Sequence, residues 1–330
     1  MSKWIVIISL ALFSLNCRQA NGKELTRVSM DSIADMVGFR ANGSLRLLAT
    51  RGFEFTISDG SKTQKVVGKG FDKKDIIKCK FSANRERIVA ITGPIRNLLF
   101  TSPLNISYKY HLSAPQGDRE TVVVFTDSLL QLDISQCQSV RNLLCREYQL
   151  TELDVTHNPD LEQLDCSENR LRTLDMSQNR NLQVLFCSKN QLKDIDVIHN
   201  QKLRELVCFD NENLSLDVSA NRNLEFLSCD GLLQELDVTN NIELRTLICR
   251  CKLTALDLSQ NKKLRKLLIS GNNFSAEELN AVFKTLPVVD YYNDTPHPEL
   301  EMSDIPGAEN CDRSLLRQRG WSPPENGPLD

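Results

Sequence analysis

The sequence predicts a solenoid in which short parallel strands, one from each repeat, form a single sheet. The first observation is a ladder of cysteines that recur every 20 or 21 residues. This cysteine ladder consists of Cys145, Cys166, Cys187, Cys208, Cys229 and Cys249, and Ile269 continues it. The second observation is a Leu-Asp-Val-Ser-like motif with the same spacing, whose aspartates are Asp133, Asp154, Asp175, Asp196, Asp217, Asp237 and Asp257. Two series that share one period over about seven units indicate a stack of similar structural units.

The third observation comes from the residues inside one unit. Residues 161–171 fit the pattern L-x-x-L-x-L-x-x-N-x-L, with Cys166 in the third leucine place. In a strand, Leu164 and Cys166 point to the same side, and one strand cannot bury them alone. Stacked units bury them in a continuous core. We therefore predict a leucine-rich-repeat solenoid over residues 129–273, with its parallel sheet on the concave face.

These repeats resemble the 21-residue, cysteine-bearing leucine-rich repeats of internalin J-like bacterial surface proteins. The resemblance covers residues 129–273, and the following segment more loosely. It implies a non-enzymatic recognition or adhesion protein that is displayed on the cell surface. The C-terminal segment carries no sortase-type motif, so we expect attachment through the N-terminus.

The ladder cysteines are expected to be small buried residues. Equivalent atoms on neighbouring parallel strands lie about 4.8 Å apart, whereas a disulfide needs Cβ atoms about 3.8 Å apart. A line of equally spaced thiols also cannot surround a metal ion tetrahedrally. We therefore predict no metal and no cofactor. Four cysteines outside the ladder cannot be paired from the sequence: Cys79, Cys137, Cys251 and Cys311.

The turns carry their own polar pattern. Each ladder aspartate can accept a backbone hydrogen bond in an Asp-x-Ser turn, which we favour over calcium binding by the stacked carboxylates. One asparagine row follows the strands at Asn169, Asn190, Asn211 and Asn272. A second row punctuates the far side at Asn158, Asn179, Asn200, Asn221, Asn241 and Asn261. The units of Cys229 and Cys249 are one residue short and lack the first asparagine, so we predict tighter turns there.

The sequence favours a binding protein over an enzyme. Acidic and basic residues are interspersed and sum to a net charge of -3, which gives no reason to expect nucleic acid as a partner. No Ser-His-Asp arrangement, phosphate loop or nucleotide fingerprint appears. An enzyme would need a pocket with paired titratable groups in residues 24–128.

The strand residues that face away from the core indicate a binding surface. The central outward row reads Leu144, Asp165, Phe186, Val207, Ser228, Ile248 and Leu268. A contiguous apolar patch on a solvent face usually marks an interaction site, and aromatic residues are good anchors for a protein partner. The predicted partner-binding residues are Leu144, Val184, Phe186, Val207, Phe209, Phe226, Ile248 and Leu268. A glycan-binding module and a structural cell-envelope lipoprotein that covers the patch by self-association are the alternatives.

The N-terminus predicts export. Lys3 precedes a mostly apolar run over residues 4–15, which is typical of a signal peptide within residues 1–17. The stretch Ser14-Leu15-Asn16-Cys17 resembles a bacterial lipobox, which implies lipidation of Cys17, although Asn16 and the place of Leu15 depart from the usual pattern. The alternative is cleavage after Ala20, which puts Arg18 where a small residue is preferred. Both routes predict an exported chain, either a surface or outer-membrane lipoprotein or a secreted protein, and only the lipid anchor would contact a membrane.

The two ends of the solenoid are predicted to carry different structures. Residues 24–128 contain short β-prone runs at 53–57, 76–81, 87–91, 106–111 and 121–125, which indicate a small β-rich domain or cap. Residues 274–321 are expected to form a helical C-terminal cap. Its first helix begins at a Ser275 capping box and ends near Leu286, and its second begins after Asp312 and ends at Gly320. Residues 322–330 are expected to be a loose tail.

Overall fold

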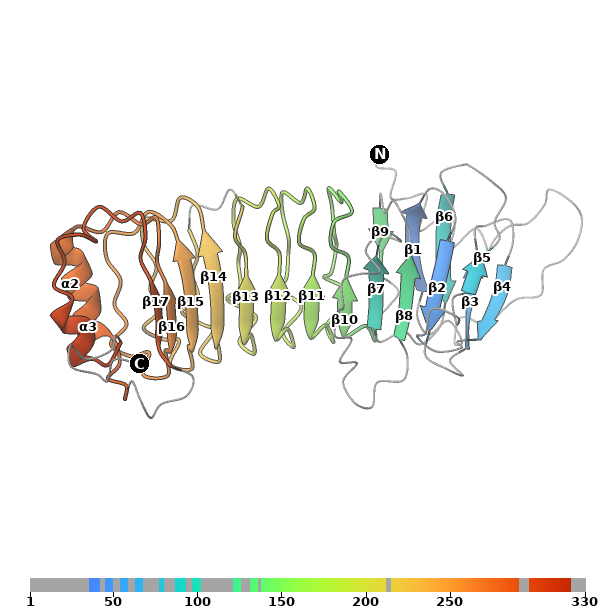
Figure 1. Cartoon of the computed structure of the whole chain (residues 1–330). Coiled ribbons are helices and arrows are strands. Elements are labelled where there is room, and N and C mark those ends of the chain that lie inside the picture. Colours follow the sequence, from blue (N-terminus) through green and yellow to red (C-terminus); the bar gives the residue numbers. More distant parts are fainter. Residues whose placement is uncertain are drawn as a thin grey trace, which may run out of the picture. The chain divides into compact units, whose positions relative to one another are not determined.

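The structure is a computed structural model. It describes residues 131–135, 138–211, 215–290 and 297–321, together with eight strands that precede residue 126 (Figure 1). The chain divides into two compact units, residues 1–140 and 141–330, which we take in turn. Among the described residues, no helix is both long and apolar enough to cross a membrane. The predicted signal segment, Cys17 and the tail lie outside the described residues.

The second unit is a solenoid built on one parallel sheet. Strands of successive repeats pair in the register that the period dictates: Leu164 lies opposite Leu185, and Leu185 opposite Leu206. The strands are β10 (Asn142–Leu144), β11 (Gln163–Asp165), β12 (Val184–Phe186), β13 (Glu205–Val207), β14 (Phe226–Asp230), β15 (Thr246–Arg250), β16 (Lys266–Leu268) and β17 (Glu299–Glu301). This arrangement is the leucine-rich-repeat fold.

The core of the solenoid follows the predicted inward pattern. All six ladder cysteines are fully buried, as are the leucines that precede them in the strands, such as Leu185 and Leu206. The prediction that the ladder cysteines face inward is therefore confirmed. Each inward residue packs against its equivalents in the two adjacent repeats, because the constant period brings like residues together.

Strand β17 corrects the expected end of the sheet. The sequence pattern ends the ladder at Ile269, yet β17 adds a further parallel strand after a helix, with Leu300 opposite Leu267. The backbone N–H of Ile269 donates to the carbonyl of Glu301 at 2.8 Å. The segment expected to be purely helical thus also contributes a strand.

The two asparagine rows satisfy the buried backbone at the turns. Asn190 accepts a hydrogen bond from the N–H of Leu171 at 3.0 Å and donates to the carbonyls of Cys166 and Cys187, both at 3.0 Å. On the far side, Asn179 donates to the carbonyls of Val155 and Asn158 at 2.9 and 2.8 Å. Asparagines of both rows therefore connect their repeats to the preceding ones, although the repeats of Cys229 and Cys249 have no asparagine in the first row.

The ladder aspartates hold their own turns. In each described turn the aspartate Oδ1 accepts the N–H of the residue two positions later, at 2.8 to 3.0 Å. The bonds to Ser177, Ser219 and Thr239 lower the pKa values of Asp175, Asp217 and Asp237. The turn-holding role is thus confirmed for these carboxylates.

The turn after most strands contains a residue in the left-handed conformation. The residue two positions after the ladder cysteine has a positive φ in most repeats, at Glu147, Glu168, Lys189, Asp210 and Gly231, and Gly271 stands at the same place after Ile269. Residues with a side chain are strained in this conformation. The repeats of Cys229 and Cys249 are one residue short, and the sequence predicts tighter turns there. Their strands, β14 and β15, are five residues long, so more of each short repeat lies in the sheet.

This strain yields a stability prediction at Lys189, whose φ is 53°. We expect Lys189→Gly to be more stable than Lys189→Ala by about 0.5–1 kcal/mol. Glycine removes the strain of the left-handed conformation, and this gain exceeds the extra conformational entropy that glycine loses on folding. Both variants lose the ion pair of Lys189 with Glu168, so the comparison isolates the backbone. Urea unfolding of the two variants measures the difference. Equal midpoints would show that this turn is not strained.

Two helices follow the last repeats. Helix α2 (Ala276–Thr285) begins at the predicted capping box, in which the Ser275 hydroxyl and the Glu278 carboxylate each accept the other residue's backbone N–H. Helix α3 (Ser314–Gln318) precedes Gly320, where an added Cβ would lie 1.9 Å from the carbonyl oxygen of Val289. The indole of Trp321 donates to the carbonyl of Pro287 at 2.9 Å and ties the two helical segments together. Both predicted helices are therefore present.

The first unit consists of strands. One sheet has the order β4-β3-β6-β1-β9, and four further strands pair in the order β7-β8-β2-β5. Their bounds are β1 (Met36–Ala41), β2 (Leu45–Ala49), β3 (Glu54–Ser58), β4 (Thr63–Val67), β5 (Ile77–Cys79), β6 (Arg87–Thr92), β7 (Asn97–Thr101), β8 (Thr121–Phe125) and β9 (Gln131–Asp133). Four of the five predicted β-prone runs coincide with β3, β5, β6 and β8. The run at 106–111 lies outside the described residues.

Candidate partner-binding face

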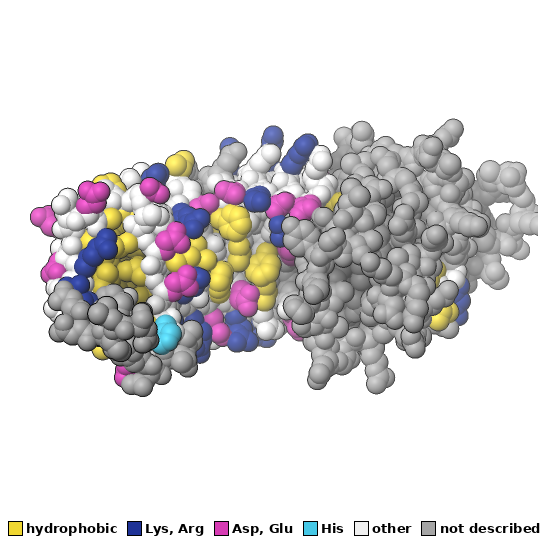
Figure 2. All heavy atoms as spheres, viewed as in Figure 1, with side chains coloured by type: hydrophobic (Ala, Val, Ile, Leu, Met, Phe, Trp, Pro, Cys, Tyr) yellow, Lys and Arg dark blue, Asp and Glu magenta, His cyan; other side chains and the backbone are white. Residues whose placement is uncertain are grey.

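The outward side chains of β10 to β16 form three rows across the sheet, which we call the sheet face. The register places Phe186 directly beside Val207, and Val207 beside Ser228. Neighbouring residues in such a row are about 4.8 Å apart. Figure 2 shows hydrophobic side chains over the middle strands of the solenoid, with acidic and basic side chains among and around them.

The central row contains two neighbouring apolar residues. Phe186 and Val207 are neighbours and both are half-buried. Asp165 precedes this pair and Ser228 follows it, and both are buried with 8% and 6% of their surface exposed. Leu144 and Ile248, also half-buried, lie beyond these two polar residues. The row is therefore a central apolar pair flanked by Asp165 and Ser228, in the order that the sequence predicts.

The two flanking rows place the other aromatic residues near this pair. Val184 and Phe226 lie in one row and are separated by the exposed Glu205. Phe209 lies on the other side of the central row, two residues after Val207, and is half-buried. The structure thus brings Phe186, Val207, Phe209 and Phe226 to three adjacent repeats, whereas Val184 is set apart from Phe226 by a carboxylate.

Leu268 does not belong to the open part of the face. Only 7% of its surface is exposed, which corrects its prediction as a contact residue. The cause is the additional strand β17, whose Glu301 lies directly opposite Leu268. The Glu301 carboxylate accepts a hydrogen bond from Ser270 at 3.1 Å and pairs with Arg250 at 3.5 Å, so this end of the face is polar and internally paired.

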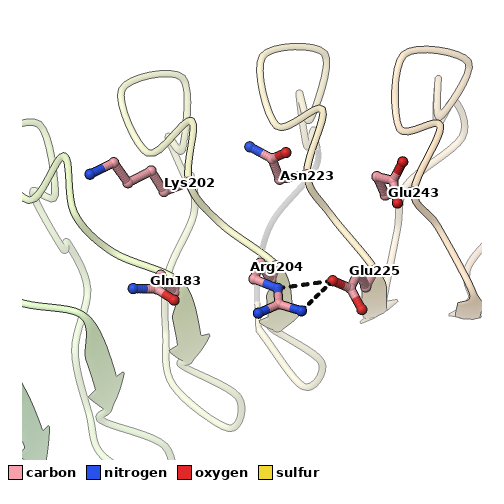
Figure 3. Close-up of a pocket in the computed structure, with 6 residues that line it drawn as sticks. All are labelled: Gln183, Lys202, Arg204, Asn223, Glu225 and Glu243. Atoms are coloured by element: carbon pink, nitrogen blue, oxygen red, sulfur yellow. Dashed lines mark hydrogen bonds and ion pairs between the residues drawn. The ribbon is translucent and has the colours of Figure 1, made fainter.

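Ion pairs between successive repeats border the face. Arg204 donates to Glu225 through two nitrogens, at 2.9 and 2.6 Å, and Arg245 approaches the same carboxylate at 3.6 Å. Figure 3 shows Arg204 and Glu225 in a shallow polar hollow that is also lined by Gln183, Lys202, Asn223 and Glu243. Lys202 and Arg204 are exposed, Glu225 and Glu243 are half-buried, and the central Arg204–Glu225 pair is already satisfied. The hollow is therefore suited to the polar rim of an interface and not to catalysis.

Two acidic residues on the face have perturbed pKa values. Burial raises the pKa of Asp230, at the end of β14, to about 6, against the opposing effect of a 2.6 Å hydrogen bond from the Asp210 N–H. Burial likewise raises the pKa of Asp165, although the Ser167 N–H donates to it at 3.0 Å. Neither residue is among the predicted partner-binding residues. Their burial depends on neighbouring side chains, and the alternation of residues along a strand does not predict it.

One local group places a hydroxyl, an imidazole and a carboxylate together without forming a nucleophile. Thr156 donates its hydroxyl to Asp154 at 2.7 Å, and the Nδ1 of His157 lies 3.2 Å from the same hydroxyl oxygen. The Asp154 carboxylate also approaches this Nδ1, at 3.7 Å. In a catalytic triad the nucleophile and the orienting acid contact opposite nitrogens of the imidazole base, whereas here both approach the same Nδ1. This group cannot activate Thr156.

No protein-family model matches the chain, and no curated protein matches it. Similar solved structures include the functional domain of InlJ from Listeria monocytogenes, which includes a cysteine ladder. Its sequence is 23% identical to this chain, and the TM-score is 0.38. The match covers 54% of this chain and 52% of that one.

Two further internalins of the same organism are similar. InlF is 18% identical with a TM-score of 0.49, over 57% of this chain and 54% of that one. InlC2 is 18% identical with a TM-score of 0.40, over 43% and 66%. The chain spans about half the length of the first two structures. By its own strands and turns the chain is a leucine-rich-repeat solenoid, and it is similar in structure to internalins, one of which includes a cysteine ladder.

Proposed function

We propose that this chain is an exported, non-enzymatic recognition protein that binds a protein partner through the sheet face. The observation that carries the proposal is the apolar centre formed by Phe186 and Val207, with Phe209 and Phe226 beside them on adjacent repeats. Half-buried aromatic side chains on a rigid sheet lose little conformational freedom when a partner covers them. Such residues supply most of the binding energy in protein interfaces.

The border of the face supports a protein partner over a glycan. An apolar centre with a charged, hydrogen-bonded rim is the usual anatomy of a protein interface, and Arg204, Glu225 and Arg245 provide such a rim. A glycan site would need amide and acid groups interleaved with the aromatics. In the central row Asp165 and Ser228 are polar but buried, which leaves them poorly placed to bind hydroxyl groups.

The location of the protein is part of the same proposal. The N-terminal run and Cys17 favour export and a lipid anchor at the cell surface, with the β-rich first unit between the anchor and the solenoid. A secreted chain and a structural envelope lipoprotein are the alternatives. Radiolabelled palmitate incorporation into the wild-type chain, but not into Cys17→Ala, would support the anchor.

The sheet face is tested by pull-down with the chain that lacks residues 1–17. We expect Phe186→Ala combined with Phe226→Ala to weaken binding of a captured partner by at least about 100-fold, because truncation of two anchor residues typically costs about 2 kcal/mol each. The measurement is the dissociation constant of the purified pair. The fold should be unchanged, since both side chains lie outside the core.

A matched control uses apolar residues away from the face. Ile198 and Ile242 are 47% and 52% exposed and lie at the far-side turns, so their double alanine variant removes comparable apolar surface. It should bind as the wild type does. Equal affinity of all three proteins would exclude the sheet face, and concentration-dependent dimers in sizing experiments that disappear in the phenylalanine variant would favour self-association.

A further inference from the structure

Three thiols converge inside the solenoid at the repeats of β14 and β15. The sulfur atoms of Cys229, Cys249 and Cys251 all lie within 4.8 Å of one another, and those of Cys249 and Cys251 are 3.2 Å apart. All three residues are buried. Among the described residues, this is the one group of three or more cysteine, histidine or acidic side chains with such a spacing.

The third thiol enters the core because its repeat is one residue short. In a 21-residue repeat, an asparagine follows the strand, and a buried leucine comes two positions after it. Asn169 and Leu171 are such a pair, and the Asn169 side chain points inward. Counted back from Leu253, the same place is held by Cys251. Gly231 holds it in the preceding repeat and contributes no side chain. Cys251 therefore sits beside the ladder and not in it, so three sulfurs form a triangle and not a line.

The triangle has the dimensions of a metal site. With metal–sulfur distances of about 2.3 Å, sulfurs in trigonal or tetrahedral coordination are separated by about 3.8–4.0 Å. The observed separations reach this value with shifts of less than about 1 Å. The next ladder cysteine does not extend the group, because the Cys208 thiol is directed to the carbonyl of Ser228 at 3.5 Å.

We propose that Cys229, Cys249 and Cys251 form a three-sulfur binding site for Cu(I). Soft thiolate ligands select soft ions, and among the first-row metals Cu(I) is the soft ion that accepts three sulfurs without a fourth ligand. Zn(II) requires four ligands, and the described residues supply three at this place. Binding exchanges protons for the metal: each thiol that becomes a thiolate ligand releases one proton to solvent, and no electron is transferred. The site is independent of the sheet face.

The test is Cu(I) titration of the reduced full chain under anaerobic conditions, with bicinchoninate as the coloured competitor. The wild type is expected to bind about one more Cu(I) per chain than Cys251→Ala. Cys187→Ala is the matched control, because Cys187 is equally buried in the ladder but outside the triangle, and it should bind as the wild type does. Copper–thiolate absorption in the near ultraviolet should fall with Cys251→Ala alone. Far-ultraviolet circular dichroism confirms that each variant is folded.

Three results would overturn the site. The first is equal Cu(I) stoichiometry in the wild type and in Cys251→Ala, with both proteins folded. The second is full displacement of Cu(I) by an equal concentration of Zn(II), which would exclude a three-coordinate soft-ion site. The third is a Cys249–Cys251 disulfide, detected by mass spectrometry, in the chain isolated from its native host. If Cys251→Ala fails to fold, Cys229→Ala removes another corner of the triangle and decides the same question.

Discussion

Asn190→Ala is expected to lower the free energy of unfolding by about 3 kcal/mol. The Asn190 side chain is buried and makes four hydrogen bonds to backbone groups: to the N–H of Leu171 and to the carbonyls of Cys166, Cys187 and Ser188. Alanine leaves these groups without that partner in the interior. A buried polar group left unsatisfied costs about 1–3 kcal/mol. Urea unfolding followed by circular dichroism measures the loss.

The control for this variant is an asparagine in the same repeat. Asn181 is only partly buried and donates to the carbonyl of Pro159 at 3.2 Å, where water can replace it. Asn181→Ala should therefore cost less than about 1 kcal/mol. If the two variants were equally stable, the buried asparagine row would not be what holds the turns between repeats.

Phe283→Ala should be the most destabilising single change, with a loss of about 3–5 kcal/mol. Phe283 is fully buried on the inner side of α2, with Leu279 and Val282. The helix is tied to the last repeats, since the hydroxyl of Thr285 accepts the N–H of Leu258 at 3.1 Å. A cavity here removes the cover of the terminal repeats, so partial unfolding should begin at β16 and β17. Hydrogen exchange read by mass spectrometry would locate it.

Lys284→Ala is the matched control on the same helix. Its side chain is exposed, so the substitution should change stability by less than about 0.5 kcal/mol. If Phe283→Ala unfolded the whole solenoid in one step, with no earlier exchange at β16 and β17, the role of α2 as a local cover would be wrong.

The repeat architecture could be predicted because one period constrains every unit. Burial of the ladder cysteines and the place of Ser275 followed from spacing and from a local capping pattern. Strand β17 could not be predicted in this way. Its residues Glu299 to Glu301 follow a helix and contain one apolar side chain, Leu300, so no periodic signal connects them to β16.

The site could be predicted only in outline. Outward rows follow from alternation along a strand, which correctly placed Phe186 beside Val207. Alternation does not report how far a neighbour covers a side chain, so the burial of Asp165 and Leu268 was missed. The cysteine triangle was missed for another reason. Cys251 comes two residues after the ladder residue Cys249, a place where other repeats have no inward side chain. It also comes two residues before the buried Leu253, where the 21-residue repeats have their inward asparagine.

The asparagine rows give the solenoid a direction. Asn200, Asn221 and their equivalents donate to carbonyls of the repeat before them, at 2.9 to 3.1 Å, so every turn is completed by its successor. The ribosome synthesises the repeats in the same order. Each new repeat can therefore donate hydrogen bonds to the repeat made before it, and the solenoid can fold from its N-terminus. During synthesis, only the most recent turn lacks these hydrogen bonds.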